Sequence, residues 1–167
     1  MKQSTKYLLL FLFYAITGFA LQVTPFVDKN IVAPFILGTT AAASTLIDLF
    51  GGSVELFGDI LRSPANGFAV KVDNGCSGLE AVILICASVL AFQTSWKMRL
   101  IGALACSATV IGINLIRIIS LFYIGQHSLE WFEWAHLYAW DILIMVDGVV
   151  AVLLWIRYAI SHTHQSA

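Results

Sequence analysis

The chain has 167 residues, of which 59% are hydrophobic and only 11% charged, and its mean hydropathy is +0.86. This composition excludes an ordinary soluble domain, and the abundant aromatic residues exclude a disordered or low-complexity chain. Nine Lys and Arg against ten Asp and Glu give a formal net charge of -1, which leaves no basic surface for nucleic acid. The three cysteines form no C-x-x-C pair, so neither a disulfide scaffold nor a metal site is expected. The composition therefore indicates a small all-α integral membrane protein.

Four stretches are long and apolar enough to cross a bilayer core of roughly 30 Å, which takes about 20 helical residues. The first begins after Lys2 and Lys6 and resembles a signal peptide, but its apolar run continues past Ala20, which favours an uncleaved anchor. We predict a single membrane domain over residues 1–167, with transmembrane helices at about 7–27, 79–96, 98–124 and 137–158.

The segment 28–78, between the first two predicted helices, contains a further apolar stretch from Ile31 to Phe50. Asp48, Glu55 and Asp59 would share one face of a helix and hydrophobic residues the other, which is typical of a helix lying on the membrane, although crossing remains open. Gly51 and Gly52 offer a break in this helix. We predict an interfacial helix here, followed by a short β-hairpin formed by residues 60–62 and 68–72.

The distribution of charge predicts how the helices are oriented. The connection 125–136 contains Glu130 and Glu133 but no Lys or Arg, so the positive-inside rule places it outside. The segment 28–78 would then also lie outside, where its five acidic residues outnumber its three basic ones. Both termini are predicted to be cytoplasmic, together with the basic residues that flank the helices, Lys2, Lys6, Lys97, Arg99 and Arg157.

Cys76 stands where the hairpin leads into the second predicted helix, in the string NGCSGLEAV. Unpaired amides and the positive end of a helix dipole stabilise a thiolate at such a position, so Cys76 is a candidate nucleophile. Cys86 and Cys106 fall in the middle of helices without polar neighbours and are predicted to be ordinary buried residues.

Arg117 lies within the third predicted helix, near the outer interface, and Asn114 precedes it by three residues on the same helix face. An arginine at the centre of a membrane helix costs at least about 2.5 kcal/mol, so it needs a partner or a function. An ion pair with Asp141 would satisfy it structurally, and a catalytic role is equally compatible with the sequence.

His136 opens the fourth predicted helix at the same outer surface, where a lone histidine is usually solvated or paired, here with Glu133. Glu80, one turn after Cys76, would orient Arg117 or His136, or simply cap its helix. A thiol, an imidazole and a guanidinium supplied by three helices at one membrane face are the groups that acyl transfer requires.

The strings FAVKVDNGCSGLEA and NLIR, followed by a lone histidine, resemble the exosortase/archaeosortase family over about residues 58–158. The resemblance implies a catalytic triad of Cys76, Arg117 and His136, with Asn114 as the Asn of the N-x-x-R motif. It implies a cysteine transpeptidase or endopeptidase, needing no cofactor or metal, in the bacterial inner membrane with its site facing the periplasm. Its substrates would be exported proteins with a PEP-CTERM-like sorting signal: a short motif, a transmembrane helix and a basic tail. The short chain resembles the compact exosortase H type.

Three other functions compete with this hypothesis. A non-enzymatic scaffold or accessory subunit of an export or exopolysaccharide system would use Arg117 and Asp141 only to lock helices together. A disulfide-generating oxidase would need paired outer cysteines, and the sequence supplies one. An aspartyl signal peptidase would need Asp141 and Asp147 together, but their spacing puts them roughly 120° apart around a helix. The sequence does not identify the nucleophile that accepts a transferred acyl group.

Overall fold

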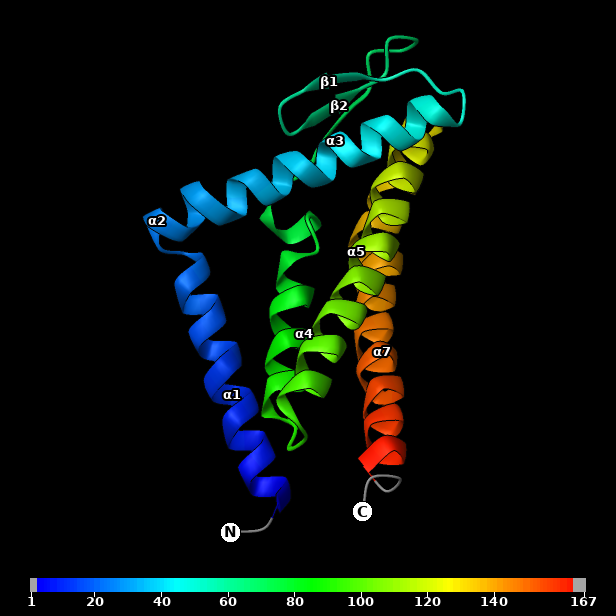
Figure 1. The fold of residues 1–167 in the computed structure, drawn as a ribbon. Coiled ribbons are helices and arrows are strands. Elements are labelled where there is room, and N and C mark those ends of the chain that lie inside the picture. The colour runs from blue at the N-terminus through cyan, green and yellow to red at the C-terminus, as the bar shows by residue number, and fades with distance from the viewer. Residues whose placement is uncertain (1–2, 164–167) are drawn as a thin grey trace.

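The structure is a computed structural model that describes residues 3–163. Four helices, α1, α4, α5 and α7, run side by side, and α3 lies across their ends (Figure 1). In the upright set, α4 packs against α1 and α5, and α7 packs against α5 and α4. The main helices are α1 (Gln3–Gln22), α3 (Ala33–Leu49), α4 (Leu79–Ala91), α5 (Trp96–His127) and α7 (Trp140–Thr163). The short helical turns are α2 (Pro25–Val27), η1 (Asp28–Val32), η2 (Asn74–Cys76), α6 (Leu129–Trp134) and η3 (Ala135–Ala139).

The helix lengths fit a membrane protein, with boundaries that differ from the predicted ones. Helical stretches long and apolar enough to cross a membrane cover Gln3–Gln22, Pro25–Leu49, Trp96–His127 and Leu129–Ser161. The second predicted helix, 79–96, is too long, because Phe92 adopts an extended backbone and α4 ends at Ala91. With 13 residues, α4 spans only about 20 Å. The third predicted helix, 98–124, begins earlier, since the Ser95 side chain accepts a hydrogen bond from the Met98 amide and caps α5.

The predicted interfacial helix corresponds to α3, whose crosswise orientation suits a helix lying along a membrane surface (Figure 1). The placement of Glu55 and Asp59 on this helix was wrong. The helix ends at Leu49, and Gly51 adopts a left-handed conformation with φ of 80° that turns the chain away. Glu55 belongs instead to a strand, where it pairs with Arg62.

The segment after α3 forms a three-stranded antiparallel sheet in the order β1-β2-β3. The predicted hairpin is present as its second and third strands, and the first strand was not predicted. Leu61, Val70 and Val72 are buried against α3 and α5, in a core that includes Ile47 and Phe122. This core fixes the sheet at the end of the upright helices. The strands are β1 (Glu55–Phe57), β2 (Ile60–Arg62) and β3 (Ala69–Lys71).

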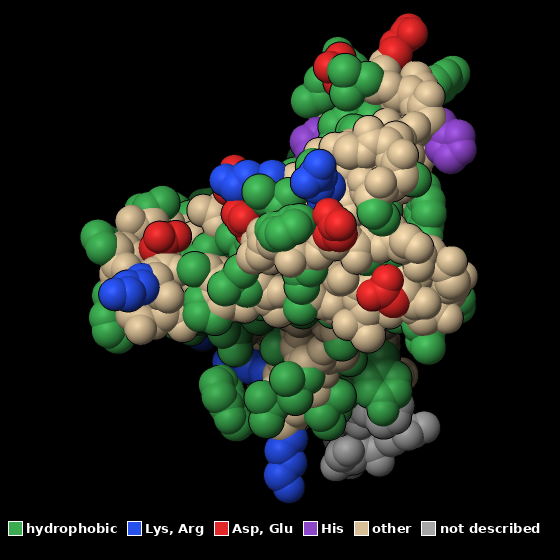
Figure 2. Space-filling model, turned by 90° about the horizontal axis from the view of Figure 1, so that it is seen from above, with side chains coloured by type: hydrophobic (Ala, Val, Ile, Leu, Met, Phe, Trp, Pro, Cys, Tyr) green, Lys and Arg blue, Asp and Glu red, His purple; other side chains and the backbone are tan. Residues whose placement is uncertain are grey.

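The outer surface carries charged side chains at one end of the molecule and apolar side chains along the upright helices. Seen from above in Figure 2, the face formed by α3 and the sheet carries Asp, Glu, Lys, Arg and His side chains among hydrophobic ones. By contrast, α1 and α7 expose large apolar side chains along their length, including Phe13, Ile16 and Leu154. Helices with exposed apolar surfaces of this kind are suited to contact with lipid.

Candidate active site

Cys76 lies in the η2 turn between the sheet and α4. Its backbone N–H donates to the Asp73 carbonyl at 2.9 Å, and the Asp73 side chain accepts from the Asn74 N–H at 3.1 Å. Gly78 follows with φ of 81° and is the residue before the first turn of α4. The left-handed glycine and the Asp73 cap together hold the thiol just before the helix begins, close to the predicted position.

His136 reaches Cys76 from η3, at the start of the run that continues into α7. Its Nε2 lies 3.0 Å from the Cys76 Sγ, within hydrogen-bond distance. The Phe132 ring, one helical turn earlier, lies 5.7 Å from the imidazole between centroids, at an interplanar angle of 32°. His136 thus contacts Cys76 and Phe132 rather than the predicted partner Glu133, which is exposed. The imidazole is therefore close enough to exchange a proton with the thiol.

Arg117 enters the same region from α5 and is only 3% exposed. Its Nη2 donates to Asp141 Oδ1 at 2.8 Å, and the Asp141 side chain is 57% exposed. The ion pair predicted as the structural alternative is thus formed. The Nε of Arg117 is buried and has no hydrogen-bond partner among residues 3–163. Because buried donors are nearly always satisfied, this N–H suits a ligand in the site.

Asn114 links α5 to the η2 turn that contains Cys76. Its Nδ2 donates to the Cys76 carbonyl oxygen at 3.1 Å, and its side chain is fully buried. A Cβ on Gly78 would lie 3.0 Å from the Asn114 Cγ, so this glycine permits the close approach. Asn114 therefore positions the turn that holds Cys76, one helical turn from Arg117.

Cys76, Arg117 and His136 all line one cavity of about 260 Å³. The sheet forms one wall through β3 and the residue after it, and α5, α6 and η3 form the others. The cavity is thus bounded by the Cys76 thiol, the His136 imidazole, a buried guanidinium and a strand. The remaining lining residues are Ala69, Val70, Lys71, Val72, Ile118, Leu121 and Phe132.

The electrostatic environment of Cys76 differs from the prediction that a helix start stabilises its thiolate. Burial raises the pKa of the Cys76 thiol, the Arg117 guanidinium opposes this, and the Asp141 and Asp73 carboxylates add to the rise. Desolvation outweighs the other effects, so the Cys76 thiol ionises less readily than an ordinary cysteine. The imidazole of His136 is the basic group in contact with its sulfur.

Of the two roles considered for Glu80, orienting Arg117 or His136 is supported by no contact among the described residues. The Glu80 side chain is exposed, and it borders a separate cavity of about 470 Å³ between α1, α4 and α7. Among the described residues, the carboxylate that pairs with Arg117 is that of Asp141, not that of Glu80. Glu80 remains the acidic residue in the first turn of α4, a position that complements the helix dipole.

Of the other two cysteines, Cys106 is buried in the core as predicted, while Cys86 is only half-buried. Cys86 Sγ lies 3.8 Å from Ser107 Oγ, and Cys106 donates to the Ala151 carbonyl at 3.5 Å. Both are free thiols, away from the cavity that Cys76 lines. Within residues 3–163, no group of three or more His, Cys, Asp or Glu side chains is arranged to hold a metal ion.

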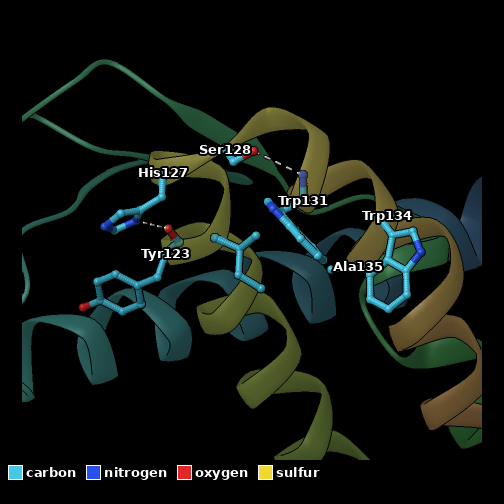
Figure 3. A pocket seen from close by; sticks show the side chains of 7 residues that line it. Tyr123, His127, Ser128, Trp131, Trp134 and Ala135 are labelled. Atoms are coloured by element: carbon cyan, nitrogen blue, oxygen red, sulfur yellow. Dashed lines mark hydrogen bonds between the residues drawn. The ribbon is translucent and has the colours of Figure 1, made fainter.

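A further hollow, with a volume of about 420 Å³, lies beside the junction of α5 and α6 (Figure 3). Trp131 and Trp134 line it and meet edge to face, with ring centroids 5.9 Å apart. His127 also lines it, but its Nδ1 is bonded to the Tyr123 carbonyl oxygen. This hollow contains none of the groups proposed for acyl transfer, and its aromatic residues suit the membrane interface.

Three features of the site were missed by sequence reasoning. Phe132 precedes His136 by four residues, a spacing that places the two on one helix face and that was visible in the sequence. The wall formed by β3 depends on long-range folding and had no comparable signal. A third feature, the Asp73 cap, was present as the string DNG, which is typical of turns.

The fold and this site define a multi-pass membrane protein with a cysteine, a histidine and an arginine at one cavity. A family model described as "Transmembrane exosortase (Exosortase_EpsH)" matches residues 2–156. The chain therefore belongs to the transmembrane exosortase family. Neither the curated proteins nor the solved structures compared with the chain give a significant match.

Proposed function

We propose that the chain is a cysteine transpeptidase or endopeptidase that processes a C-terminal sorting signal of membrane-anchored, exported proteins. The observation that carries the proposal is the 3.0 Å separation of Cys76 Sγ and His136 Nε2 at a cavity that Arg117 also lines. A thiol in contact with an imidazole base is the arrangement of an activated cysteine nucleophile. The signal would contain a short motif, a transmembrane helix and a basic tail, as in the related family.

The proposed reaction uses each of the three side chains once. His136 takes the proton of the Cys76 thiol, and the sulfur attacks the scissile carbonyl carbon, whose oxygen becomes an oxyanion. Arg117 donates to this oxyanion. The C–N bond then breaks, the leaving amine takes the proton from His136, and a thioester remains. An acceptor amine or water attacks the thioester, releases the Cys76 thiol and completes the transfer or hydrolysis.

We place the site on the periplasmic face of the bacterial inner membrane, with both termini in the cytoplasm. The basic residues at the helix ends support this orientation through the positive-inside rule. The arrangement in Figure 1 is compatible with it, since α1 begins and α7 ends at the side of the molecule opposite α3 and the sheet. A substrate helix in the same membrane would bring its motif to the level of Cys76, which lowers the entropic cost of positioning.

The experiment is coexpression with a genetically neighbouring protein that ends in a short motif, an apolar helix and a basic cluster. We expect Cys76→Ala to abolish the loss of that C-terminal segment, measured by intact mass, while the enzyme remains membrane-inserted. Cys86→Ala is the matched control and should leave processing unchanged, because Cys86 lies outside the cavity. Normal processing by Cys76→Ala would refute the proposal.

A non-enzymatic scaffold remains the second candidate, and the Arg117–Asp141 ion pair is the observation that favours it. In that case Cys76→Ala would be silent, and loss of Arg117 or Asp141 would reduce the amount of folded protein. The Cys76–His136 contact favours the enzyme, because a scaffold has no need for a thiol beside an imidazole.

A further inference from the structure

The third strand, β3, forms one edge of the sheet, and no strand among the described residues pairs with its outer side. The sheet order is β1-β2-β3, so β3 pairs with β2 on one side only. Its residues line the cavity that contains Cys76 and His136. An unpaired strand edge offers a row of backbone donors and acceptors to another extended chain.

The register shows which backbone groups of β3 face this edge. The Val72 N–H donates to the Asp59 carbonyl at 2.8 Å, and the Phe68 carbonyl accepts from the Ser63 N–H at 2.8 Å. Hydrogen-bonded pairs alternate along an antiparallel ladder, so Val70 also bonds toward β2.

The backbone groups of Ala69 and Lys71 therefore point away from β2. In the ladder register they stand opposite Arg62 and Ile60, in the pairs that exchange no hydrogen bonds. Among the described residues, no backbone hydrogen bond outside the sheet involves Ala69 or Lys71. Their N–H and C=O groups are available beside the cavity.

The side chains of β3 are arranged so that a peptide could approach this edge. Val70 is buried in the core under the sheet, while Ala69 and Lys71 are exposed. Lys71 is held by Asp59 at 3.8 Å and Asp73 at 3.5 Å, so its ammonium group has carboxylate partners outside the cavity lining. The exposed side chains of β3 thus place neither a bulky apolar group nor an unpaired charge at this edge.

We propose that the substrate binds as an extended strand along the free edge of β3, pairing with the backbone of Ala69 and Lys71 and presenting its scissile carbonyl to Cys76. This inference rests on the proposed function and adds the conformation in which the signal motif is recognised. The strand supplies backbone hydrogen bonds, the mode known as β-augmentation, and side-chain pockets in the cavity would add sequence preference. Because β3 leads directly through Asp73 into the Cys76 turn, pairing on β3 also sets the register of the peptide relative to the sulfur.

The test measures how fast Cys76 is alkylated by probes that differ in backbone hydrogen bonding, using the purified full-length protein in detergent. Acetyl-trialanine vinyl sulfone is the peptide probe, its fully N-methylated analogue lacks backbone donors, and iodoacetamide reports the thiol alone. In the vinyl sulfone reaction the sulfur bonds to the β-carbon, and the α-carbon takes a proton. Modification is quantified by mass spectrometry on the peptide that contains Cys76.

On the wild-type protein, we expect N-methylation to slow the peptide probe by at least roughly fivefold relative to iodoacetamide, the effect of losing one or more hydrogen bonds. Lys71→Pro removes the N–H that faces the free edge and should slow the unmodified peptide probe by a similar factor. Proline is tolerated on an edge strand because the Lys71 N–H has no ladder partner. Lys71→Ala is the comparison for Lys71→Pro: it loses the same side chain and ion pairs but keeps the N–H, so the peptide probe, normalised to iodoacetamide, should react faster with Lys71→Ala than with Lys71→Pro.

Equal rates for both peptide probes on the wild type would overturn the proposal, even if Lys71→Pro failed to fold. So would a Lys71→Pro protein that reacts normally with both iodoacetamide and the peptide probe. Neither result would affect the proposed function, which is tested separately by processing in cells with Cys76→Ala. Conversely, processing by Cys76→Ala would remove the proposed function whatever the alkylation rates.

Discussion

The environment of Arg117 is compatible with two roles, a structural ion pair and the proposed contact with an oxyanion. Arg117 forms an ion pair with the half-exposed carboxylate of Asp141, and it keeps a buried Nε–H without a described partner beside the cavity. The ion pair offsets the cost of placing a guanidinium among apolar helices. A guanidinium has several donors in one plane, so it can hold Asp141 and still donate to an oxyanion.

The substitution Arg117→Lys separates these roles. Lysine retains a charge for Asp141 but cannot reproduce the planar fork, so we expect processing to fall by at least about tenfold while the protein remains folded. Processing of the coexpressed substrate and the melting temperature in detergent are the two measurements. Full activity of Arg117→Lys would assign Arg117 to the structural ion pair alone.

The raised pKa of Cys76 predicts how reactivity depends on pH. Burial raises the pKa of the Cys76 thiol, so its thiolate fraction is still increasing as the pH passes through the ordinary pKa of a thiol. The rate of alkylation by iodoacetamide should therefore keep rising over that pH range. Arg117 opposes the rise in the pKa, so Arg117→Gln should shift the profile further toward alkaline pH. The measurement is the alkylation rate of Cys76 at stepped pH, and a rate already at its plateau at neutral pH would contradict the prediction.

At the scale of elements, the site depends on how α4 begins. The turn that holds Cys76 passes through the left-handed Gly78 and is tied to α5 by Asn114. On the other side of the cavity, His136 lies in η3, which follows α6 and precedes α7. The side chains of Cys76 and His136 therefore come from short segments at helix ends, η2 and η3, which the packed helices hold in place.

Gly78→Ala tests this arrangement. The substitution forces a side chain into a left-handed conformation and places its Cβ 3.0 Å from Asn114, so we expect a loss of about 1–3 kcal/mol in stability. The Cys76–His136 contact should also loosen, which would appear as a changed alkylation rate. Gly75→Ala is the matched control: its Cβ would meet nothing within 4 Å, so stability should change little. Equal melting temperatures for both variants would rule out the strained turn as a support of the site.

At the scale of the whole molecule, the sheet and α3 lie together at one end of the upright helices, and the candidate site lies at the junction (Figure 1). The charged residues of this face and the apolar flanks of α1 and α7 define a molecule that meets water at the sheet and lipid along the helices. A protein substrate anchored in the same bilayer would reach the cavity from the membrane surface.

The proposed orientation can be tested in intact cells. A membrane-impermeant maleimide added from outside should label Cys76, once the outer membrane is made permeable, because the site is placed on the periplasmic side. Cys76→Ser provides the control, since the remaining cysteines lie within α4 and α5. Labelling of Cys76 that appears only after the inner membrane is also opened would reverse the proposed topology.

The sequence by itself was sufficient to predict the membrane class and the approximate helices, and to select the three side chains proposed for catalysis. Long apolar runs are a local property, and an arginine or a histidine beside such a run stands out because burying it is costly. The end of α4 at Ala91 and the first strand, β1, were not predicted, since the extended backbone of Phe92 and the pairing of β1 with β2 are set by tertiary packing.

Only the tertiary structure brought Cys76 within 3.0 Å of His136, 60 residues later in the chain, and placed the free edge of β3 beside them. It also reversed the expected effect on the thiol, because desolvation by packed neighbours outweighs the favourable end of a helix. Distances across a fold and the burial of a group depend on how elements pack, and a sequence pattern records neither.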